Sequence, residues 1–179
     1  MPEHQDHTTP TVLRPEDHVL GRATAPILLL EFGDFQCPTC KQAAPVVDML
    51  LKQHEQQIRF AFRHYPLENL HPDAVLAAEA AESAAAQGRF WDMHAFLFEH
   101  QQHLKSPDLE GYAAELGLDV TRFRADMREH VHLARIGADL ALGQQLQVRS
   151  TPGFFINGKF QDVSFGMRSL HDAVQSLLD

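Results

Sequence analysis

The chain has 179 residues, of which 44% are hydrophobic and 22% charged, and its formal net charge is −9 at pH 7. This composition is typical of a globular protein with its own core, and no stretch approaches the roughly 20 apolar residues of a membrane span. The negative charge argues against nucleic acid as a partner, and only two cysteines, in one motif, leave no separate structural disulfide.

The first 16 residues are polar, and we expect them to form a flexible tail. Acidic residues and histidines stand where a secretory signal would have a basic segment followed by an apolar core. The sequence as given therefore indicates a cytoplasmic protein. A periplasmic or extracellular location follows instead if this is a mature form whose export signal has been removed.

The first predicted strand, residues 27–32 (ILLLEF), leads into both cysteines, which lie in residues 37–40 (CPTC). Pro38 suits the first turn of a helix, because the N–H that proline lacks would have no helical partner there. This helix should run to about residue 54 and be kinked at Pro45. Cys37 is thus expected at a helix N-terminus, where unpaired N–H groups and the helix dipole favour a thiolate.

Two cysteines at this spacing predict thiol–disulfide exchange. Cys37 would attack as a thiolate, and Cys40, one helical turn on, would attack the resulting mixed disulfide and release the partner. Thr39 brings no positive charge, so we expect the pKa of Cys37 to be lowered only moderately, to about 6–7.5.

Two other interpretations of the pair are open. The cysteines could supply half of a zinc site with some of the 12 histidines, although no second pair of metal ligands follows at finger-like spacing. They could also be ordinary buried cysteines, which the position of Pro38 between strand and helix disfavours. We therefore expect no metal.

A second strand is predicted over residues 57–64, where alternation places Ile58, Phe60 and Phe62 on one face. A strand–helix–strand unit ordinarily makes a right-handed crossover between parallel strands, and the functional loop then lies at the carboxyl end of the first strand.

The pattern then becomes helical from Pro72 to about residue 147, with Pro72 as a first helical residue. Helices are expected over about 72–87, 90–103, 106–116 and from 119 onward. The last segment returns to strands, 153–156 and 159–161, joined by a two-residue Asn157-Gly158 turn. Apolar residues at helical spacing from Met167 to Leu177 predict a closing amphipathic helix.

Four stretches together resemble the disulfide-bond-forming oxidoreductase (DsbA-like) family: residues 31–40 (EFGDFQCPTC), 62–67 (FRHYPL), 88–91 (GRFW) and 148–158 (VRSTPGFFING). The resemblance implies an α/β, thioredoxin-like fold with an inserted all-helical subdomain. The thioredoxin-like parts would be residues 17–69 and 148–179, and the helical insertion residues 70–147.

The resemblance also implies roles for single residues. Pro152 matches the family's cis-proline, which lies beside the cysteine pair, and Thr151 would offer backbone groups to a substrate peptide. Pro38 and Thr39 would complete the substrate-binding surface. Glu31 matches a buried acid that assists proton movement, although an exposed acid at the end of a strand is an open alternative. If Glu31 is buried, Arg59 or Arg63 would be its partner, because an unpaired buried charge is costly.

The sequence thus predicts a protein-disulfide oxidoreductase that needs no bound cofactor. Its partners would be cysteine-containing proteins or peptides and a redox partner that donates thiols or accepts a disulfide. The alternative is a redox-sensing or regulatory binding module that uses the thioredoxin fold without turnover.

Overall fold

The computed structural model describes residues 12–179, and its centre is a five-stranded sheet in the order β1-β3-β2-β4-β5. The strands are β1 (His18–Leu20), β2 (Ile27–Gly33), β3 (Ile58–His64), β4 (Gly153–Ile156) and β5 (Lys159–Gln161). As predicted, β2 and β3 are parallel. The predicted hairpin is also confirmed, since β4 and β5 are antiparallel and turn at Asn157 and Gly158, both with positive φ.

Helix α1 (Pro38–Gln53) connects β2 to β3 and packs on one face of the sheet. Pro38 stands in its first turn, as expected, and the helix continues through Pro45. Ile58, Phe60 and Phe62 share one face of β3 and belong to the same buried cluster as α1. The other face of the sheet is buried against helix α6 (Leu133–Gln145).

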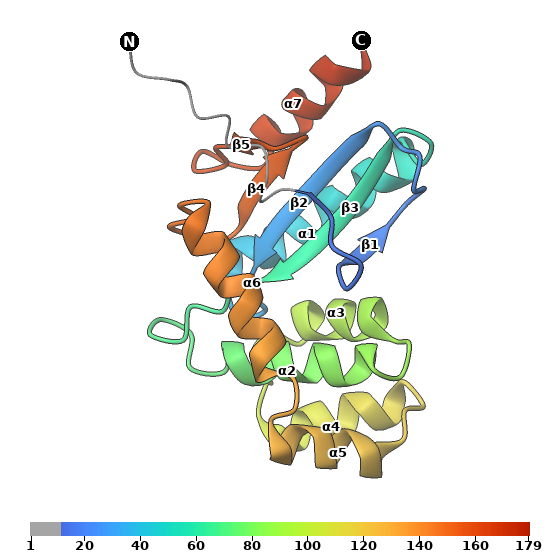
Figure 1. The fold of residues 1–179 in the computed structure, drawn as a ribbon, viewed down its shortest axis with the longest axis vertical. Helices are drawn as coiled ribbons and strands as arrows, with labels where there is room; N and C mark the ends of the chain where they lie inside the picture. Colours follow the sequence, from blue (N-terminus) through green and yellow to red (C-terminus); the bar gives the residue numbers. More distant parts are fainter. Residues whose placement is uncertain (1–11) are drawn as a thin grey trace.

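Four helices form a block beyond the carboxyl ends of β2 and β3, and α6 leads from this block back to the sheet (Figure 1). The block contains α2 (Ala74–Ala85), α3 (Phe90–Glu99), α4 (Ser106–Glu115) and α5 (Val120–Glu129). Helix α7 (Arg168–Leu178) closes the chain. This arrangement confirms a thioredoxin-like fold with inserted helices.

Two helix boundaries differ from the prediction. Helix α2 begins at Ala74 rather than Pro72: Asp73 precedes the helix, with φ −98° and ψ 1°, and its N–H donates to Gln36 Oε1, 2.7 Å away. Helix α3 ends at Glu99 rather than near residue 103, since His100 leaves the helical region. At both boundaries, the non-helical residues next to the helix, Asp73 before α2 and those that follow Glu99, contact the loop before Cys37.

Helix α6 packs closely against Tyr65 and Phe32 at Gly143, so a side chain at this position would force a neighbour to shift. A Cβ on Gly143 would lie 2.5 Å from the ring of Tyr65. The Tyr65 hydroxyl in turn donates a hydrogen bond of 2.7 Å to the carbonyl oxygen of Val148. This packing positions the segment that leads from α6 to Thr151.

Residues 1–11, most of the expected tail, lie outside the described residues. Of the remainder, Arg14 forms ion pairs with Asp17, at 2.9 Å, and with the buried Asp139 of α6. Asp17 Oδ2 also accepts a hydrogen bond of 2.7 Å from Arg63. The chain just before β1 is therefore tied to β3 and α6.

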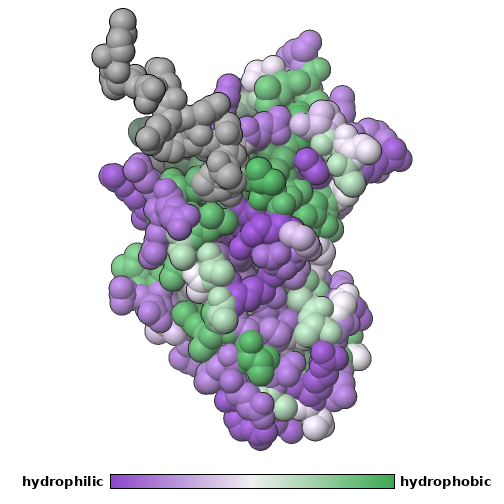
Figure 2. Space-filling view, viewed as in Figure 1, coloured by the Kyte–Doolittle hydropathy of each residue, from purple (hydrophilic) through white to green (hydrophobic). Residues whose placement is uncertain are grey.

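The face shown in Figure 2 is largely polar over the helical block, and its apolar residues gather in separate patches. Among residues 12–179, no helix has both the length and the apolar character needed to cross a membrane.

Candidate functional site

The two cysteines lie at the start of α1, at the end of the loop that follows β2. Cys37 is the residue immediately before the helix, with extended backbone angles (φ −74°, ψ 123°), so the helix N-terminus begins at its side chain. Its N–H donates to the carbonyl oxygen of Asp34 at 3.1 Å. Cys37 is 6% exposed and Cys40 is fully buried, and both are free thiols. Pro38 is exposed and Thr39 partly exposed beside them.

The pKa values of the two thiols are separated by their surroundings. A hydrogen bond from Cys40 is the main cause that lowers the pKa of Cys37 to about 5; burial opposes it, and the N–H groups of Cys40 and Thr39 add to the lowering. Burial, the hydrogen bond to Cys37 and the charge of Glu31 raise the pKa of Cys40 well above its usual value. The Cys37 pKa lies below the range expected from the sequence, because donors within the motif replace the missing charge.

The loop between α6 and β4 contacts Cys37. Cys37 Sγ lies 3.4 Å from the carbonyl oxygen of Thr151, although 114 residues separate them in sequence. Thr151 is 9% exposed, and the Thr151–Pro152 peptide bond is cis. The structure thus brings the residues singled out in the two motifs to one place.

Glu31 is buried under this site, on the face of β2 that packs against α1. It is 2% exposed, which excludes the alternative of a surface acid, and Oε1 has no hydrogen-bond partner among the described residues. Burial, with a smaller effect from the charge of Cys37, raises the pKa of Glu31 to about 8. The carboxyl group is therefore largely neutral at pH 7.

The expected pairing of Glu31 with Arg59 or Arg63 is wrong. In the parallel register, Arg59 lies beside Leu28 and Arg63 beside Phe32, which places both arginines on the other face of the sheet. Arg59 donates to the carbonyl oxygen of Ala23, and Arg63 binds Asp17.

The loop before Cys37 is held by side chains that the sequence analysis did not single out. The buried Asp34 carboxylate accepts hydrogen bonds from the N–H of Gln36 at 2.8 Å and of Leu67 at 2.9 Å, and it pairs with His71 Nδ1 at 2.7 Å. Asp34 falls within the motif at residues 31–40, which was the one signal in the sequence for its importance.

The helical block supplies two further contacts to this loop. Gln36 and Asp73 exchange hydrogen bonds, with Gln36 Oε1 accepting from the Asp73 N–H at 2.7 Å. Gln101 Nε2 donates to the carbonyl oxygens of Phe35, at 2.9 Å, and Cys37, at 2.7 Å. No motif in the sequence indicated a role for Gln101.

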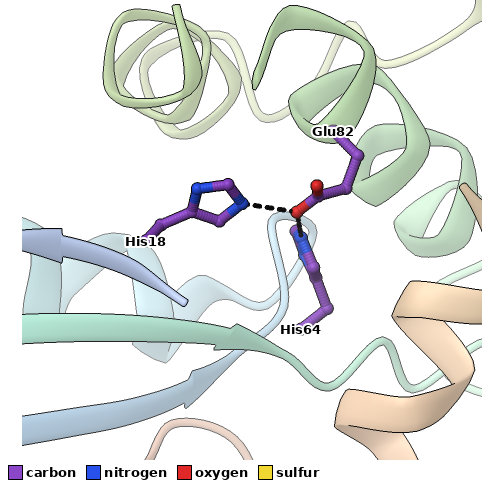
Figure 3. Close-up of side chains that lie close together, drawn as sticks. All are labelled: His18, His64 and Glu82. Atoms are coloured by element: carbon purple, nitrogen blue, oxygen red, sulfur yellow. Dashed lines mark hydrogen bonds and ion pairs between the residues drawn. The ribbon is translucent and has the colours of Figure 1, made fainter. Parts of the chain in front are cut away.

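A second polar cluster joins the sheet to the helical block (Figure 3). His18 Nε2 and His64 Nε2 both lie near Glu82 Oε1, at 2.7 and 2.6 Å. Although burial would raise it, hydrogen bonds from the two histidines hold the pKa of Glu82 well below its usual range. Arg135 Nε is 2.9 Å from the same oxygen.

This cluster contains the kinds of ligand that bind a metal ion, and within residues 12–179 it is the one such group found. Cys37 and Cys40 do not belong to it. The Arg135 guanidinium already places a positive charge on the shared Glu82 oxygen, so the cluster is better described as an ion pair reinforced by two histidines.

A dithiol at the N-terminus of the helix that follows a central parallel strand, with a cis-proline loop against it, defines the thioredoxin-fold class of proteins. A sequence profile of the thioredoxin family matches residues 13–176, and the chain belongs to that family. Within it, the fold with its inserted helices is similar to that of DsbA-type proteins, as the solved structures show.

Solved structures share this architecture over nearly the whole chain. BdbD from Bacillus subtilis, in its oxidised form, has a TM-score of 0.80 at 22% identity and covers 89% of this chain and 91% of its own. A thioredoxin-like oxidoreductase from Silicibacter pomeroyi has a TM-score of 0.79 at 28% identity, covering 92% and 93%. The thiol-disulfide exchange protein alpha-DsbA2 from Wolbachia pipientis has a TM-score of 0.76 at 19% identity, covering 90% and 87%.

Sequence relatives of higher identity bear a different kind of name. Na(+)/H(+) antiporter NhaA 1 of Salinispora arenicola is 44% identical over 89% of this chain, and Na(+)/H(+) antiporter NhaA of Herminiimonas arsenicoxydans is 38% identical over 90%. The matched regions are 24% and 26% of those proteins. The chain therefore spans about a quarter of the length of these curated relatives.

Proposed function

We propose that this protein is a thiol–disulfide oxidoreductase that exchanges a Cys37/Cys40 dithiol and disulfide with protein or peptide substrates. The observation that carries the proposal is the placement of the pair: Cys37 stands at the N-terminus of α1 against the cis Thr151–Pro152 loop, and Cys40 is fully buried one turn behind it. This placement lowers the Cys37 pKa to about 5 and raises the Cys40 pKa well above its usual value. At pH 7 Cys37 is a thiolate and Cys40 a thiol, so one sulfur is ready to attack and the other is held back.

Reduction of a substrate would proceed in two displacements. The Cys37 thiolate attacks one sulfur of the substrate disulfide; a Cys37–substrate disulfide forms and the other substrate sulfur leaves as a thiolate. Cys40 then loses its proton and attacks Cys37 Sγ, which forms the Cys37–Cys40 disulfide and releases the second substrate thiolate. Two electrons pass to the substrate, and substrate oxidation is the same sequence reversed. A thiol donor or a disulfide acceptor of another protein must restore the starting state.

Glu31 fits the role of proton acceptor in the second displacement. The charge of Cys37 contributes to the raised pKa of Glu31, and this charge disappears when Cys37 is in a mixed disulfide. Glu31 then ionises more readily and can accept the Cys40 proton, directly or through water. Its place on the buried face of β2 that packs against α1 suits this function.

The substrate would bind across the exposed Pro38 and the Thr151–Pro152 loop. Thr151 contacts Cys37 Sγ through its carbonyl oxygen, so its backbone stands where an extended peptide attached to that sulfur would pass. Pairing of peptide backbone with Thr151 would accept many substrate sequences.

A second candidate is a redox-sensing or regulatory module that binds a partner without turnover. It is favoured by the curated relatives named as antiporters, in which a domain related to this chain occupies about a quarter of a longer protein. Reduction of insulin by dithiothreitol, followed as turbidity, separates the two functions. Catalysis that disappears in Cys37→Ser supports the oxidoreductase. A folded protein that cycles between dithiol and disulfide without accelerating the reaction supports the module.

A further inference from the structure

The loop that ends at Cys37 touches the helical block through Gln101, a residue outside both thioredoxin-like parts. Gln101 follows α3, in the turn that arises because this helix stops at Glu99. The side chain is 5% exposed, and its one amide nitrogen donates to two carbonyl oxygens, those of Phe35 and Cys37. A primary amide has two N–H bonds, so both donors are used on the active loop.

Both acceptors depend on this amide, to different degrees. The Phe35 carbonyl oxygen has Gln101 as its one hydrogen-bond donor among the described residues, whereas the Cys37 carbonyl oxygen also accepts from the Lys41 N–H at 3.2 Å in the first turn of α1. A buried carbonyl that loses its donor must be exposed to water or shift. In a loop of four residues between β2 and α1, such a shift moves Cys37 itself.

Gln101 is itself held firmly. The turn that carries it is closed by a hydrogen bond of 2.8 Å from the His103 N–H to the His100 carbonyl oxygen, and the Tyr112 hydroxyl donates to His103 at 2.7 Å. The rings of His100 and Tyr112 stack at 5.1 Å. The amide therefore belongs to a rigid support rather than to a mobile loop.

We propose that Gln101 is a positioning residue of the dithiol site, through which the helical insertion fixes the backbone of residues 35–37 and with it the place of the Cys37 sulfur. The low Cys37 pKa requires Sγ to stay in line with the thiol of Cys40 and the N–H groups of Thr39 and Cys40. These donors belong to α1, whereas the backbone that precedes Cys37 is held by Gln101 of the helical insertion. Gln101 thus keeps the sulfur and its donors in register.

The inference rests on the proposed function in that it concerns the same dithiol, but its test requires no exchange partner. The pH dependence of Cys37 alkylation by iodoacetamide is measured for the reduced protein, for Gln101→Met and for Gln87→Met. Methionine keeps the length of glutamine and removes both donors. Gln87 is the matched control, since it also lies in the helical block and makes two hydrogen bonds to backbone, at 3.1 and 2.8 Å, both to Asp119.

We expect the alkylation midpoint of Gln101→Met to rise by about one pH unit or more, and that of Gln87→Met to stay within about 0.3 units of the unsubstituted protein. Gln101→Asn retains the amide on a shorter side chain and should shift the midpoint less than Gln101→Leu, which has a similar size and no donors. An unchanged midpoint in a folded Gln101→Met protein, or equal shifts in the two methionine variants, would overturn the proposal.

A measurement on the unsubstituted protein covers the case in which the variants do not fold. The side-chain amide resonances of Gln101 in a ¹⁵N NMR spectrum should titrate with the same midpoint as Cys37 alkylation, and those of Gln87 should not. Absence of such a titration at Gln101 would contradict the inference. If the alkylation and NMR results are as expected but the protein does not catalyse insulin reduction, the proposed function is contradicted and the positioning role of Gln101 is still supported.

Discussion

His71 Nδ1 lies 2.7 Å from Asp34 Oδ2, and this pair joins the loop before the cysteines to the start of the helical insertion. Asp34 is fully buried, and the same carboxylate also accepts from two backbone N–H groups. An acid so placed is stabilised only as long as its donors remain.

We therefore expect Asp34→Asn to lower the free energy of unfolding by about 2–4 kcal/mol, because the amide cannot accept all three hydrogen bonds and turns a donor toward them. His71→Ala removes one of the three donors and should cost about 1 kcal/mol. Urea denaturation of the reduced proteins measures both values. Equal losses in the two variants would show that the backbone donors contribute nothing.

Cys40→Ser should accumulate mixed disulfides with substrate proteins, because Cys37 can still attack but no second sulfur releases the partner. Cys37→Ser should form none, since Cys40 is fully buried and its pKa is raised. Non-reducing electrophoresis after incubation with an oxidised peptide distinguishes them. Trapping by Cys37→Ser alone would reverse the assigned order of attack.

Glu31→Gln should stabilise the reduced protein, and more so as pH rises. The folded-state pKa of Glu31 is raised from about 4.5 to about 8, so the folded protein holds a proton that the unfolded chain has lost, and stability falls with pH across that window. Glutamine removes this fall. We expect a gain in unfolding free energy of about 1–3 kcal/mol at pH 8 and little at pH 5.

The charge of Cys37 acts in the opposite direction and provides the internal control. Its folded-state pKa is lowered to about 5, so its contribution to stability is present above the unfolded pKa and is lost as pH falls through about 5. As pH rises above about 5, the unfolding free energy of Glu31→Gln should therefore increase, because Cys37 still ionises, whereas that of Cys37→Ala should not. Parallel curves for the two variants would mean that the shifted pKa values are not those of these groups.

The reduction potential should lie between about −250 and −150 mV. A thiolate with a pKa near 5 stabilises the dithiol form more than one near 7, the value in thioredoxin with its potential of about −270 mV, and less than one near 3.5, the value in DsbA with about −120 mV. Equilibration with glutathione redox buffers measures it. A value below about −270 mV would mean that the thiolate contributes little to the stability of the reduced form.

Local patterns were sufficient to predict β2 to β5 and the dithiol, but not the edge strand β1. The apolar run before Cys37, the proline after it and the Asn157-Gly158 turn each have one favoured structure, and together they predicted the parallel pair, the hairpin and the helix N-terminus. The motif at residues 148–158 directed attention to Thr151, which the structure places against Cys37.

The contacts around the dithiol could not be predicted in the same way. The partner of Arg63 depends on strand register, which assigns it to the face opposite Glu31. Gln101 enters the site because α3 ends at Glu99, whereas the sequence pattern favoured a helix four residues longer. The Cys37 pKa depends on donors a few ångströms from the sulfur, which residue types alone do not give.

The contact between Gly143 and Tyr65 has a consequence for engineering and for natural variation in this protein. Position 143 is far from the cysteines in sequence, yet any larger residue there must displace the Tyr65 ring or α6, because a Cβ would lie 2.5 Å from that ring. Either shift would disturb the hydrogen bond from Tyr65 to Val148, and with it the chain that leads to Thr151. A substitution at residue 143 would thus leave every motif intact and still alter the support of the Thr151 loop, so a library of variants should hold this position constant.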